Sequence, residues 1–404
     1  MVTYPSDWKE IKIGDTGRVI TGSTPSTSNK HYWGKEYTWI TPTDIDDRVF
    51  MYSSERKLSK QGFEISRQLP PGSVLITCIA SIGKNCILAG VGSCNQQINA
   101  IIPSEKYDSR YIYYLMNFSK DTLENLAGIT ATKILNKKTF EAIKFCVPEL
   151  SEQQAIASVL SNFDEHIDDL SELIEKKKAI RDGALEDLLS GRTRLDGFSG
   201  EWESIPFSQY FTLLPTNTYS REQLSDSGEI GNIHYGDVLI KYGCVLSQND
   251  YIPRLIDASK VNVKQYLNKN DVIIADTAED ETVGKAVQIG ELNIPLISGL
   301  HTIACRPNYQ TAGGFLGYYI NSNCYHDQLL PYITGIKVSS ISKKSIGETE
   351  LYIPVDPKEQ QAIAEVLTAM DEEIESLETE KEKMIQIKEG AMDDLLTGRV
   401  RLNV

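Results

Sequence analysis

Two stretches of the sequence, 207 residues apart, are near-copies of each other. The first begins Glu152-Gln-Gln-Ala-Ile-Ala157 and ends Asp187-Leu-Leu-Ser-Gly-Arg-Thr-Arg-Leu195, and the second begins Glu359-Gln-Gln-Ala-Ile-Ala364 and ends Asp394-Leu-Leu-Thr-Gly-Arg-Val-Arg-Leu402. Aligned without a gap, residues 152–195 and 359–402 are identical at 24 of 44 positions. Chance does not produce such a match, so the chain contains a duplicated unit of about 200 residues.

Each copy has the features of one long helix. Ser151 is placed as an N-cap with a Gln three residues later, the pattern of a capping box. Asp356 followed by Pro357 predicts the start of the second helix. Gly191 and Gly398 stand where a left-handed C-terminal cap is needed. Each helix is expected to run about 38 residues, or ~57 Å at 1.5 Å per residue.

Apolar residues recur in both helices on a seven-residue scheme, which is typical of a coiled-coil seam. In the first helix these are Ile156, Leu160, Phe163, Ile167, Leu170, Ile174, Ala184 and Leu188, and in the second Ile363, Leu367, Met370, Ile374, Leu377, Met384, Ala391 and Leu395. The seam is interrupted at Lys177 and Arg181 in one copy and at Lys381 and Lys388 in the other. Each helix could pack on its own globular half alone, but a helix of this length outreaches a compact domain of 150 residues. The two helices are therefore expected to pack on each other as an antiparallel coiled coil.

The remainder of the duplicated unit has diverged, but landmarks stay in order. Ala100 and Pro103 match Ala304 and Pro307 at an offset of 204. Short apolar runs predict strands at residues 73–79, 98–102, 237–240, 271–275 and 302–304, and helical patterns lie near residues 109–126 and 311–330. The expected fold class is α+β: two mixed α/β domains, residues 1–147 and 196–352, separated by long repeated helices within residues 148–195 and 353–404, with an internal pseudo-two-fold repeat.

The composition is that of an ordinary soluble protein, with 404 residues, 41% hydrophobic and 24% charged. No secretory signal and no apolar run long enough to span a membrane is present, so a cytoplasmic location is expected. The seven cysteines form no C-x-x-C pair and the five histidines are scattered singly. Reduced thiols and no metal site are therefore expected.

The formal charge of −15 argues, taken alone, against a general nucleic-acid binder. It is unevenly distributed: residues 1–150 carry +3 and residues 201–350 carry −6, whereas residues 151–200 and 351–404 carry −5 and −7. The two helical segments thus hold most of the acidity.

Motifs of catalysis are missing. The sequence has no G-x-x-x-x-G-K-[ST] or G-x-G-x-x-G loop, no Asn-Pro-Pro or Asp-Pro-Pro element of amino-methyltransferases, and no G-x-S-x-G or H-E-x-x-H. The chain is expected to catalyse no reaction by itself.

The alternation of two diverged globular halves with two near-identical helices resembles the specificity (S) subunit of type I restriction-modification systems. The resemblance covers essentially the whole chain. Its motifs are Val147-Pro148 through Ile156, Ile353-Pro354 through Ile363, and, in the first half, Gly22-Ser-Thr-Pro25, Tyr32-Trp33, Trp39-Ile40, Leu69-Pro-Pro-Gly-Ser-Val-Leu-Ile76 and Ser81-Ile-Gly83. The second half departs from this pattern, with Leu214-Pro215 in place of Gly-Ser-Thr-Pro and no Tyr-Trp pair.

The resemblance implies that each globular half is a target recognition domain that reads one half of a split DNA sequence. The helices would act as a spacer and would bind two modification (methyltransferase) subunits, which restriction (endonuclease/translocase) subunits would join. S-adenosylmethionine, ATP and Mg are expected on those partners, and no cofactor in this chain. A duplicated chain imitates a two-fold dimer, which suits two half-sites about one DNA turn apart, ~34–36 Å. Because the halves have diverged, the half-sites should differ in sequence.

Polar side chains that reach base edges are needed for such reading, since Arg and Lys pair with guanine while Asn and Gln pair with adenine. The DNA-binding candidates are Lys30, Lys84, Asn95, Gln96, Gln97, Lys133 and Lys137 in the first half and Lys241, Lys285, His301, Lys337, Lys343 and Lys344 in the second. The candidates for contact with modification subunits, with helix capping as the alternative role, are Glu152, Gln153, Gln154, Glu359, Gln360 and Gln361. Trp33 and Trp39 are expected in the core.

Two other functions stay open on the sequence. A coiled-coil scaffold with two protein-binding heads would bind no DNA with any partner. A self-contained restriction or methylation enzyme would bind its cofactor as the pure chain.

Overall fold

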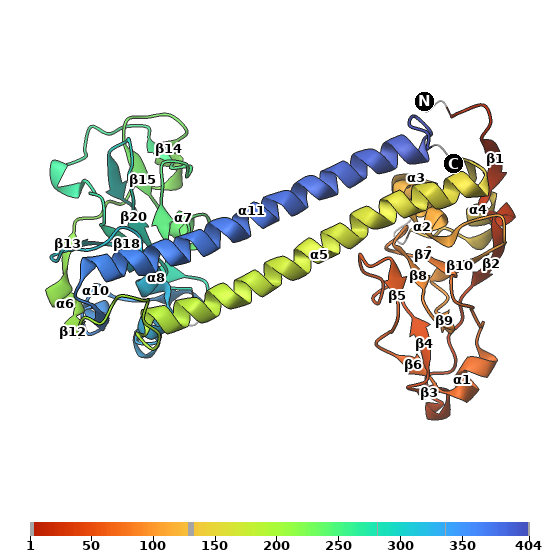
Figure 1. Cartoon of the computed structure of the whole chain (residues 1–404), viewed down its shortest axis with the longest axis horizontal. Coiled ribbons are helices and arrows are strands. Elements are labelled where there is room, and N and C mark those ends of the chain that lie inside the picture. Colours follow the sequence, from red (N-terminus) through yellow and green to blue (C-terminus); the bar gives the residue numbers. More distant parts are fainter. Residues whose placement is uncertain (1–3, 128–132, 281, 336, 403–404) are drawn as a thin grey trace. The chain divides into compact units, whose positions relative to one another are not determined.

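The computed structural model describes residues 4–127, 133–280, 282–335 and 337–402 (Figure 1). The chain divides into two compact units. Unit 1 consists of Met1–Ser171 with Thr379–Val404, and unit 2 consists of Glu172–Glu378. The division falls inside both long helices, so each unit contains one globular half and a segment of each helix.

Unit 1 is a mixed α/β structure with three sheets, in strand orders β1-β11, β2-β10-β7-β8-β5 and β3-β6-β4-β9. The strands are β1 (Lys9–Lys12), β2 (Gly17–Thr21), β3 (Trp33–Gly34), β4 (Tyr37–Ile40), β5 (Phe50–Met51), β6 (Lys57–Leu58), β7 (Val74–Thr77), β8 (Asn85–Leu88), β9 (Gly92–Cys94), β10 (Ile98–Pro103) and β11 (Lys144–Val147). The short helices are α1 (Lys60–Ile65), α2 (Ser109–Phe118), α3 (Lys120–Leu126) and α4 (Lys137–Ala142), with 3-10 turns η1 (Ile13–Asp15) and η2 (Lys30–Tyr32).

Unit 2 contains sheets in strand orders β12-β24, β13-β22-β18-β20-β16, β14-β17-β15-β21 and β19-β23. The strands are β12 (Trp202–Pro206), β13 (Phe211–Leu214), β14 (Leu224–Ser225), β15 (Gly231–Ile233), β16 (Val245–Leu246), β17 (Arg254–Leu255), β18 (Val272–Ala275), β19 (Thr277–Ala278), β20 (Ala286–Ile289), β21 (Leu296–Ser298), β22 (Thr302–Pro307), β23 (Ser339–Ser340) and β24 (Glu350–Pro354). The short helices are α6 (Phe207–Tyr210), α7 (Tyr235–Ile240), α8 (Phe315–Asn321), α9 (Asn323–His326) and α10 (Lys343–Ile346), with turns η3 (Arg221–Gln223), η4 (Val263–Gln265) and η5 (Leu330–Tyr332).

The two units share one topology. The five-stranded sheets match strand for strand, and in both the last pair, β5–β8 and β16–β20, is parallel while the others are antiparallel. The parallel pair β4–β9 in unit 1 likewise corresponds to β15–β21 in unit 2. The duplication predicted from the helices therefore extends through the diverged globular halves.

A central strand divides each core into two layers, because successive side chains on a strand point to opposite faces. In β7, Val74 and Ile76 pack with α2 and the long helices, whereas Leu75 packs with Ile40 and Ala100 toward the four-stranded sheet. Figure 1 shows the resulting order in unit 1, from the helices through the five-stranded sheet to the β3–β4–β6–β9 end. In β18 of unit 2, Ile274 and Ile273 divide between two core clusters in the same way.

One predicted strand is wrong. Residues 237–240 form part of helix α7 instead. His234 caps this helix, since its Nδ1 accepts a hydrogen bond from the Gly236 amide at 3.3 Å. The fully buried carboxylate of Asp237, in the first turn, forms an ion pair with Arg221 at 2.9 Å. These polar contacts outweigh the strand propensity of the apolar run.

The long helices are α5 (Leu150–Leu189) and α11 (Pro357–Leu396), each of 40 residues. The start of α11 is as predicted, because Asp356 Oδ1 accepts the Lys358 amide at 2.9 Å and Pro357 is the first helical residue. The predicted N-cap at Ser151 is wrong: α5 begins at Leu150, two residues before the start that this cap predicts, and Ser151 is an exposed residue inside the helix. Both predicted C-terminal glycines are confirmed by a φ of +72°.

Within each unit the two helix segments run antiparallel and are joined by ion pairs. In unit 1, Asp164 binds Lys388. In unit 2, Lys177 binds Glu373 at 2.7 Å and Arg181 binds Asp371 at 3.2 Å. Three of the four charged residues that interrupt the apolar seam, Lys177, Arg181 and Lys388, therefore face carboxylates of the other helix.

Two glycine substitutions in unit 2 test the assignment of Gly191 as the C-terminal cap of α5. Gly191→Ala should lower the free energy of unfolding by about 1–2 kcal/mol, since a side chain disfavours positive φ, and its Cβ would meet the Trp202 ring at 3.3 Å. Gly183→Ala, in the interior of α5 with nothing within 4 Å of the added Cβ, should raise it by roughly 0.5–1 kcal/mol. Urea unfolding of both variants measures the difference, and shifts of the same sign would contradict the C-cap assignment.

Candidate nucleic-acid interface

Three loops that are distant in the sequence meet in unit 1. The Cys78 amide donates to the Gln97 carbonyl at 2.8 Å, and the Ala80 amide donates to the Lys133 carbonyl at 3.1 Å. The Leu135 amide in turn donates to the Cys78 carbonyl at 2.8 Å. We call residues 78–84, 95–97 and 133–137 the loop cluster of unit 1.

The equivalent loops meet in unit 2 through equivalent bonds. The Asp276 amide donates to the His301 carbonyl at 3.1 Å, and the Ile341 amide donates to the Asp276 carbonyl at 2.9 Å. Strand β19, which follows Asp276, pairs with β23. We call residues 276–280, 282–285, 299–301 and 337–344 the loop cluster of unit 2.

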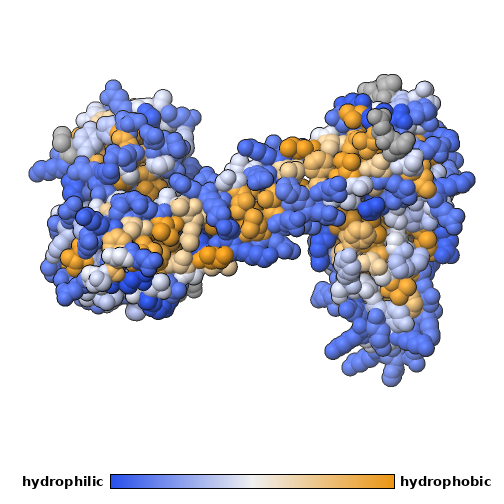
Figure 2. Space-filling view, in the orientation of Figure 1, coloured by the Kyte–Doolittle hydropathy of each residue, from blue (hydrophilic) through white to orange (hydrophobic). Residues whose placement is uncertain are grey.

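Most of the predicted DNA-binding residues lie in these two clusters. They are Lys84, Asn95, Gln96, Gln97, Lys133 and Lys137 in unit 1, and Lys285, His301, Lys337, Lys343 and Lys344 in unit 2. Two predicted residues lie elsewhere. Lys30 is exposed on η2, at the end of unit 1 that carries the four-stranded sheet, where Figure 2 shows a largely hydrophilic surface. Lys241, at the end of α7, binds the buried Asp237 at 3.1 Å.

The cluster residues differ in how free their side chains are. Lys84 and Gln96 are exposed. Lys133 and Lys137 form exposed ion pairs with Glu124 and Glu141 at 3.7 and 3.4 Å, which water can readily replace. These four side chains can therefore turn toward a ligand at low energetic cost.

Lys285 is less free than the exposed lysines of the clusters. Its Nζ donates to the Leu239 carbonyl at 2.9 Å, and burial lowers the pKa of the ammonium group. It lines a pocket of about 590 Å³ together with Arg181, Cys244, His326 and Asp371. A contact of Lys285 with DNA stays a prediction, and its ammonium group would have to leave the Leu239 carbonyl to make that contact.

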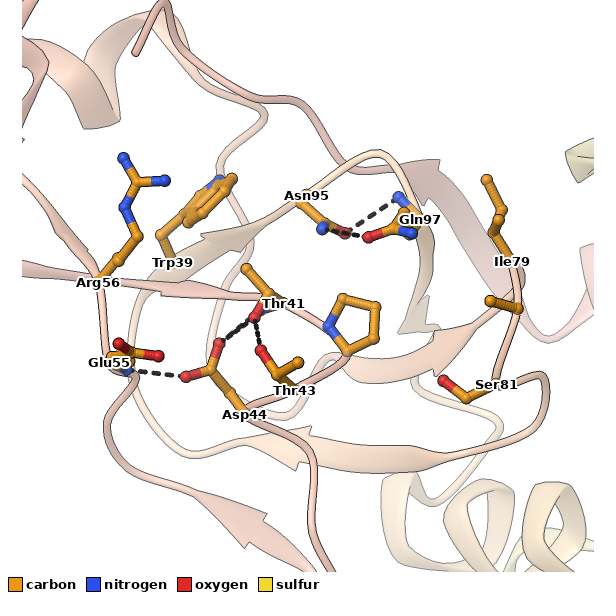
Figure 3. Close-up of a pocket in the computed structure, with 12 residues that line it drawn as sticks. Trp39, Thr41, Thr43, Asp44, Glu55, Arg56, Ile79, Ser81, Asn95 and Gln97 are labelled. Atoms are coloured by element: carbon orange, nitrogen blue, oxygen red, sulfur yellow. Dashed lines mark hydrogen bonds between the residues drawn. The ribbon is translucent and has the colours of Figure 1, made fainter.

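A pocket of about 440 Å³ opens beside the loop cluster of unit 1 (Figure 3). One wall carries Asn95 and Gln97, and the other carries Trp39 and Arg56. Its floor is fixed by Asp44, whose carboxylate accepts the Thr41 amide at 2.8 Å and the Glu55 amide at 2.8 Å. The backbone of Ala80, also in the lining, has a φ of +64°, a conformation that side chains disfavour and that concentrates at functional sites.

Arg56 is a site residue that the sequence did not reveal. Its guanidinium lies 3.6 Å from the centre of the Trp33 ring and 5.4 Å from that of Trp39. The two indoles pack edge to face at 4.9 Å, and the Trp39 Nε1 donates to the Ser23 carbonyl at 3.0 Å. The predicted core position is confirmed for Trp39, which is 3% exposed, and is wrong for Trp33, which is only partly buried. These rings hold an exposed cation at the rim of the pocket, where it can approach a phosphate or a guanine edge.

The corresponding place in unit 2 carries rings instead of amides. His301 packs edge to face on Tyr235 at 5.4 Å, and its Nδ1 lies 3.5 Å from the Asp276 carboxylate. His234, which is largely buried, has a lowered pKa because burial disfavours the charged imidazole. The two units therefore present different chemistry at equivalent places.

The predicted partner-binding residues at the helix starts are mostly used inside the units. Glu152 is 5% exposed and binds Arg401 through two contacts of 2.6 and 2.8 Å. Glu359 is 1% exposed and binds Arg194 in the same way at 2.5 and 2.6 Å. The negative charge of each Glu is thus neutralised by the arginine that follows the end of the other helix.

The first glutamine of each copy is also buried and satisfied. Gln153 accepts the Asp108 amide at 3.1 Å and donates to the Pro148 carbonyl at 2.9 Å. Gln360 accepts the Ala312 amide at 3.1 Å and donates to the Pro354 carbonyl at 2.9 Å. Only Gln154 and Gln361 are exposed, so the prediction of partner contact is kept for these two residues.

A second duplicated network joins the helices to each globular core. In unit 1, the Tyr114 hydroxyl donates to Asp164 at 2.5 Å, and the same carboxylate binds Lys388. In unit 2, the Tyr318 hydroxyl donates to Asp371 at 2.8 Å, and Arg181 binds that carboxylate. The position of the helix pair against the core is therefore fixed by the same kind of contact in both units.

Neither a metal site nor a membrane helix is found in the part of the chain that the structure describes. In residues 4–127, 133–280, 282–335 and 337–402, no three His, Cys, Asp or Glu side chains are arranged to hold a metal ion. Over these same ranges, no helix has the length and apolar character required to cross a bilayer.

A family model for the type I restriction modification DNA specificity domain matches the chain twice, at residues 5–180 and 200–386. The chain belongs to this family. The two matches correspond to the two structural repeats, and together they cover most of the sequence.

This chain is similar in sequence to specificity subunits of known type I restriction enzymes and similar in fold to a solved chain. The type I restriction enzyme MjaIX specificity subunit of Methanocaldococcus jannaschii is 38% identical over 180 residues, 43% of this chain and 40% of that protein. This match therefore spans about two fifths of the relative. The MjaVIII specificity subunit of the same organism is 24% identical over 433 residues, 98% of this chain and 94% of that protein. The same fold is found in a solved chain from a structural study of complex assembly and conformational transition of the type I R-M system. The TM-score is 0.61 at 14% identity, and the match covers 98% of this chain and 100% of that one.

Proposed function

We propose that this chain is the DNA sequence-recognition subunit of a type I restriction-modification complex. Each globular half reads one part of a bipartite, asymmetric DNA target. The observation that carries this proposal is the specificity-domain match at both halves, each with a loop cluster of the same architecture and different side chains. The protein catalyses no reaction itself and positions the catalytic subunits on the target.

The duplication supports a bipartite target. Two heads of one topology can each approach a DNA groove with the same loops, as the two halves of a symmetric dimer do. Because Asn95 and Gln97 in unit 1 correspond to Gly299 and His301 in unit 2, the two heads offer different hydrogen-bonding groups. An asymmetric target follows from this difference.

The partners complete the proposal. Two modification subunits bind this chain and supply S-adenosylmethionine, and restriction subunits supply ATP- and Mg-dependent cleavage. The acidic helices, kept away from phosphates, leave most of the electrostatic attraction to these partners. The exposed Gln154 and Gln361 are candidates for contact with the modification subunits. The proposal includes the predicted cytoplasmic location.

Nuclease footprinting of the chain co-purified with its modification subunits tests the function. We expect a stable complex that protects two short DNA segments of defined sequence. The DNA between these two segments should show no sequence preference. We expect little protection by the isolated chain. A complex that binds proteins through both heads but protects no DNA would instead support the alternative function, a coiled-coil protein-interaction scaffold with two binding heads.

A further inference from the structure

Gln97 and His301 occupy the same position in the two units. Each is the third residue of a three-residue loop, residues 95–97 between β9 and β10 and residues 299–301 between β21 and β22. The carbonyl of each accepts an amide from the residue that directly follows the central strand, Cys78 after β7 and Asp276 after β18. The two residues therefore hold equivalent positions in the two folds, although His301 has a positive φ and Gln97 does not.

Asn95 orients the side-chain amide of Gln97 but leaves some of its hydrogen-bonding groups available. The buried Asn95 donates from Nδ2 to Gln97 Oε1 at 3.0 Å and accepts the Gln97 backbone amide at 3.0 Å (Figure 3). A carbonyl oxygen has a second lone pair, and the Nε2 group carries two donors. Gln97 is half-buried in the pocket wall and can still make the paired contact with adenine N6 and N7 that this side chain favours.

The imidazole of His301 is held differently. Its Nδ1 lies 3.5 Å from the Asp276 carboxylate and 3.4 Å from the Thr277 hydroxyl, and its side chain is 49% exposed. Because the Thr277 hydroxyl donates to Asp276 Oδ1 at 2.8 Å, the ring donates from Nδ1 toward these oxygens, and its acceptor lone pair is at Nε2 on the other side. The backbone of His301 has a φ of +54°, a strained conformation found preferentially at functional sites.

We propose that Gln97 and His301 are the equivalent base-reading residues of the two heads and that their difference makes the two half-sites different. Gln97 pairs with the adenine of one base pair in the half-site of unit 1. His301, whose Nδ1 faces Asp276, accepts at Nε2 a hydrogen bond from a base donor, adenine N6 or cytosine N4, at the corresponding base pair in the half-site of unit 2. This inference rests on the proposed function and adds to it which residue reads in each head.

The test is a methylation survey by long-read sequencing of a host that expresses the modification subunits with one variant of this chain at a time. Gln97→Glu keeps the size of the side chain and removes its donors, and Gln97→His installs the residue of the other head. We expect the preference for one base pair of one half-site to fall roughly 5- to 100-fold among the methylated sites. This is the usual discrimination that a bidentate base contact provides. His301→Gln should alter one base pair of the other half-site only.

The matched control is Gln61→Glu, the same change at an exposed position of α1 in unit 1 and outside the loop cluster, which should leave the motif unchanged. Thermal unfolding and co-purification with the modification subunits identify variants that fail to fold. If Gln97→His fails to fold, Gln97→Glu still tests the role of the Gln97 side chain. A wild-type motif retained by folded Gln97 and His301 variants would overturn this inference and leave the proposed function standing. A wild-type chain that directs no split motif would overturn the proposed function itself.

Discussion

Glu359→Ala is expected to lower the free energy of unfolding of unit 2 by about 3–5 kcal/mol, the usual result of removing one member of a buried ion pair. The Glu359 carboxylate is 1% exposed and receives both branches of the Arg194 guanidinium. It also accepts the Trp202 indole Nε1 at 3.3 Å. Without it, a partly buried arginine and an indole donor lose their partner where α11 begins. Urea unfolding followed by circular dichroism measures the loss.

Glu378→Ala on the same helix is the control. Glu378 pairs with Lys178 at 2.7 Å, but both side chains are well exposed, 47% and 38%. Such a pair contributes less than about 1 kcal/mol. Equal losses for the two variants would contradict the account of Glu359 as a buried anchor of the helix start.

A coordinated deletion in both long helices should shorten the gap between the two DNA half-sites, if the proposed function holds. Removing residues 172–178 from α5 and 374–380 from α11 takes seven residues from each helix, or ~10.5 Å at 1.5 Å per residue. At 3.4 Å per base pair, the tolerated gap should decrease by about three base pairs. The deletion keeps the heptad phase and leaves the Asp164–Lys388 and Arg181–Asp371 pairs intact.

The gap is measured by a methylation survey with the variant complex. Deleting residues 172–178 alone is the control, because it displaces α5 against α11 and should destabilise the chain. A folded double-deletion variant that methylates sites with the original gap would refute the helices as the spacer.

The long helices could be predicted from the sequence because both copies carry the apolar seven-residue repeat and the C-terminal glycine. Their lengths, their glycine caps and the Asp356 start follow from local preferences that the structure bears out. The helix α5 does not start after Ser151 because the side chain that turns back at this helix start is Gln153, which donates to the Pro148 carbonyl. The burial of Glu152 and Glu359 was missed because their arginine partners lie more than 160 residues away in the sequence.

The heads were harder to predict because their contacts are non-local. Residues 237–240 have the composition of a strand, and the helix is explained by the His234 cap together with the ion pair of Asp237 with Arg221. Arg56 carries no motif, and its place over Trp33 depends on the pairing of β3 with β6, which sets Trp33 opposite Leu58, two residues after Arg56. The equivalence of Gln97 and His301 was present as a signal, since the offset of 204 that relates Ala100 to Ala304 also relates these two residues.

The most direct test of the account is long-read methylation sequencing of the host genome with and without the gene for this chain. The account predicts that deletion removes adenine methylation at one split motif with two unlike halves, and that restoring the gene restores it. An unchanged methylome in a host that expresses the modification subunits would contradict DNA recognition by this chain.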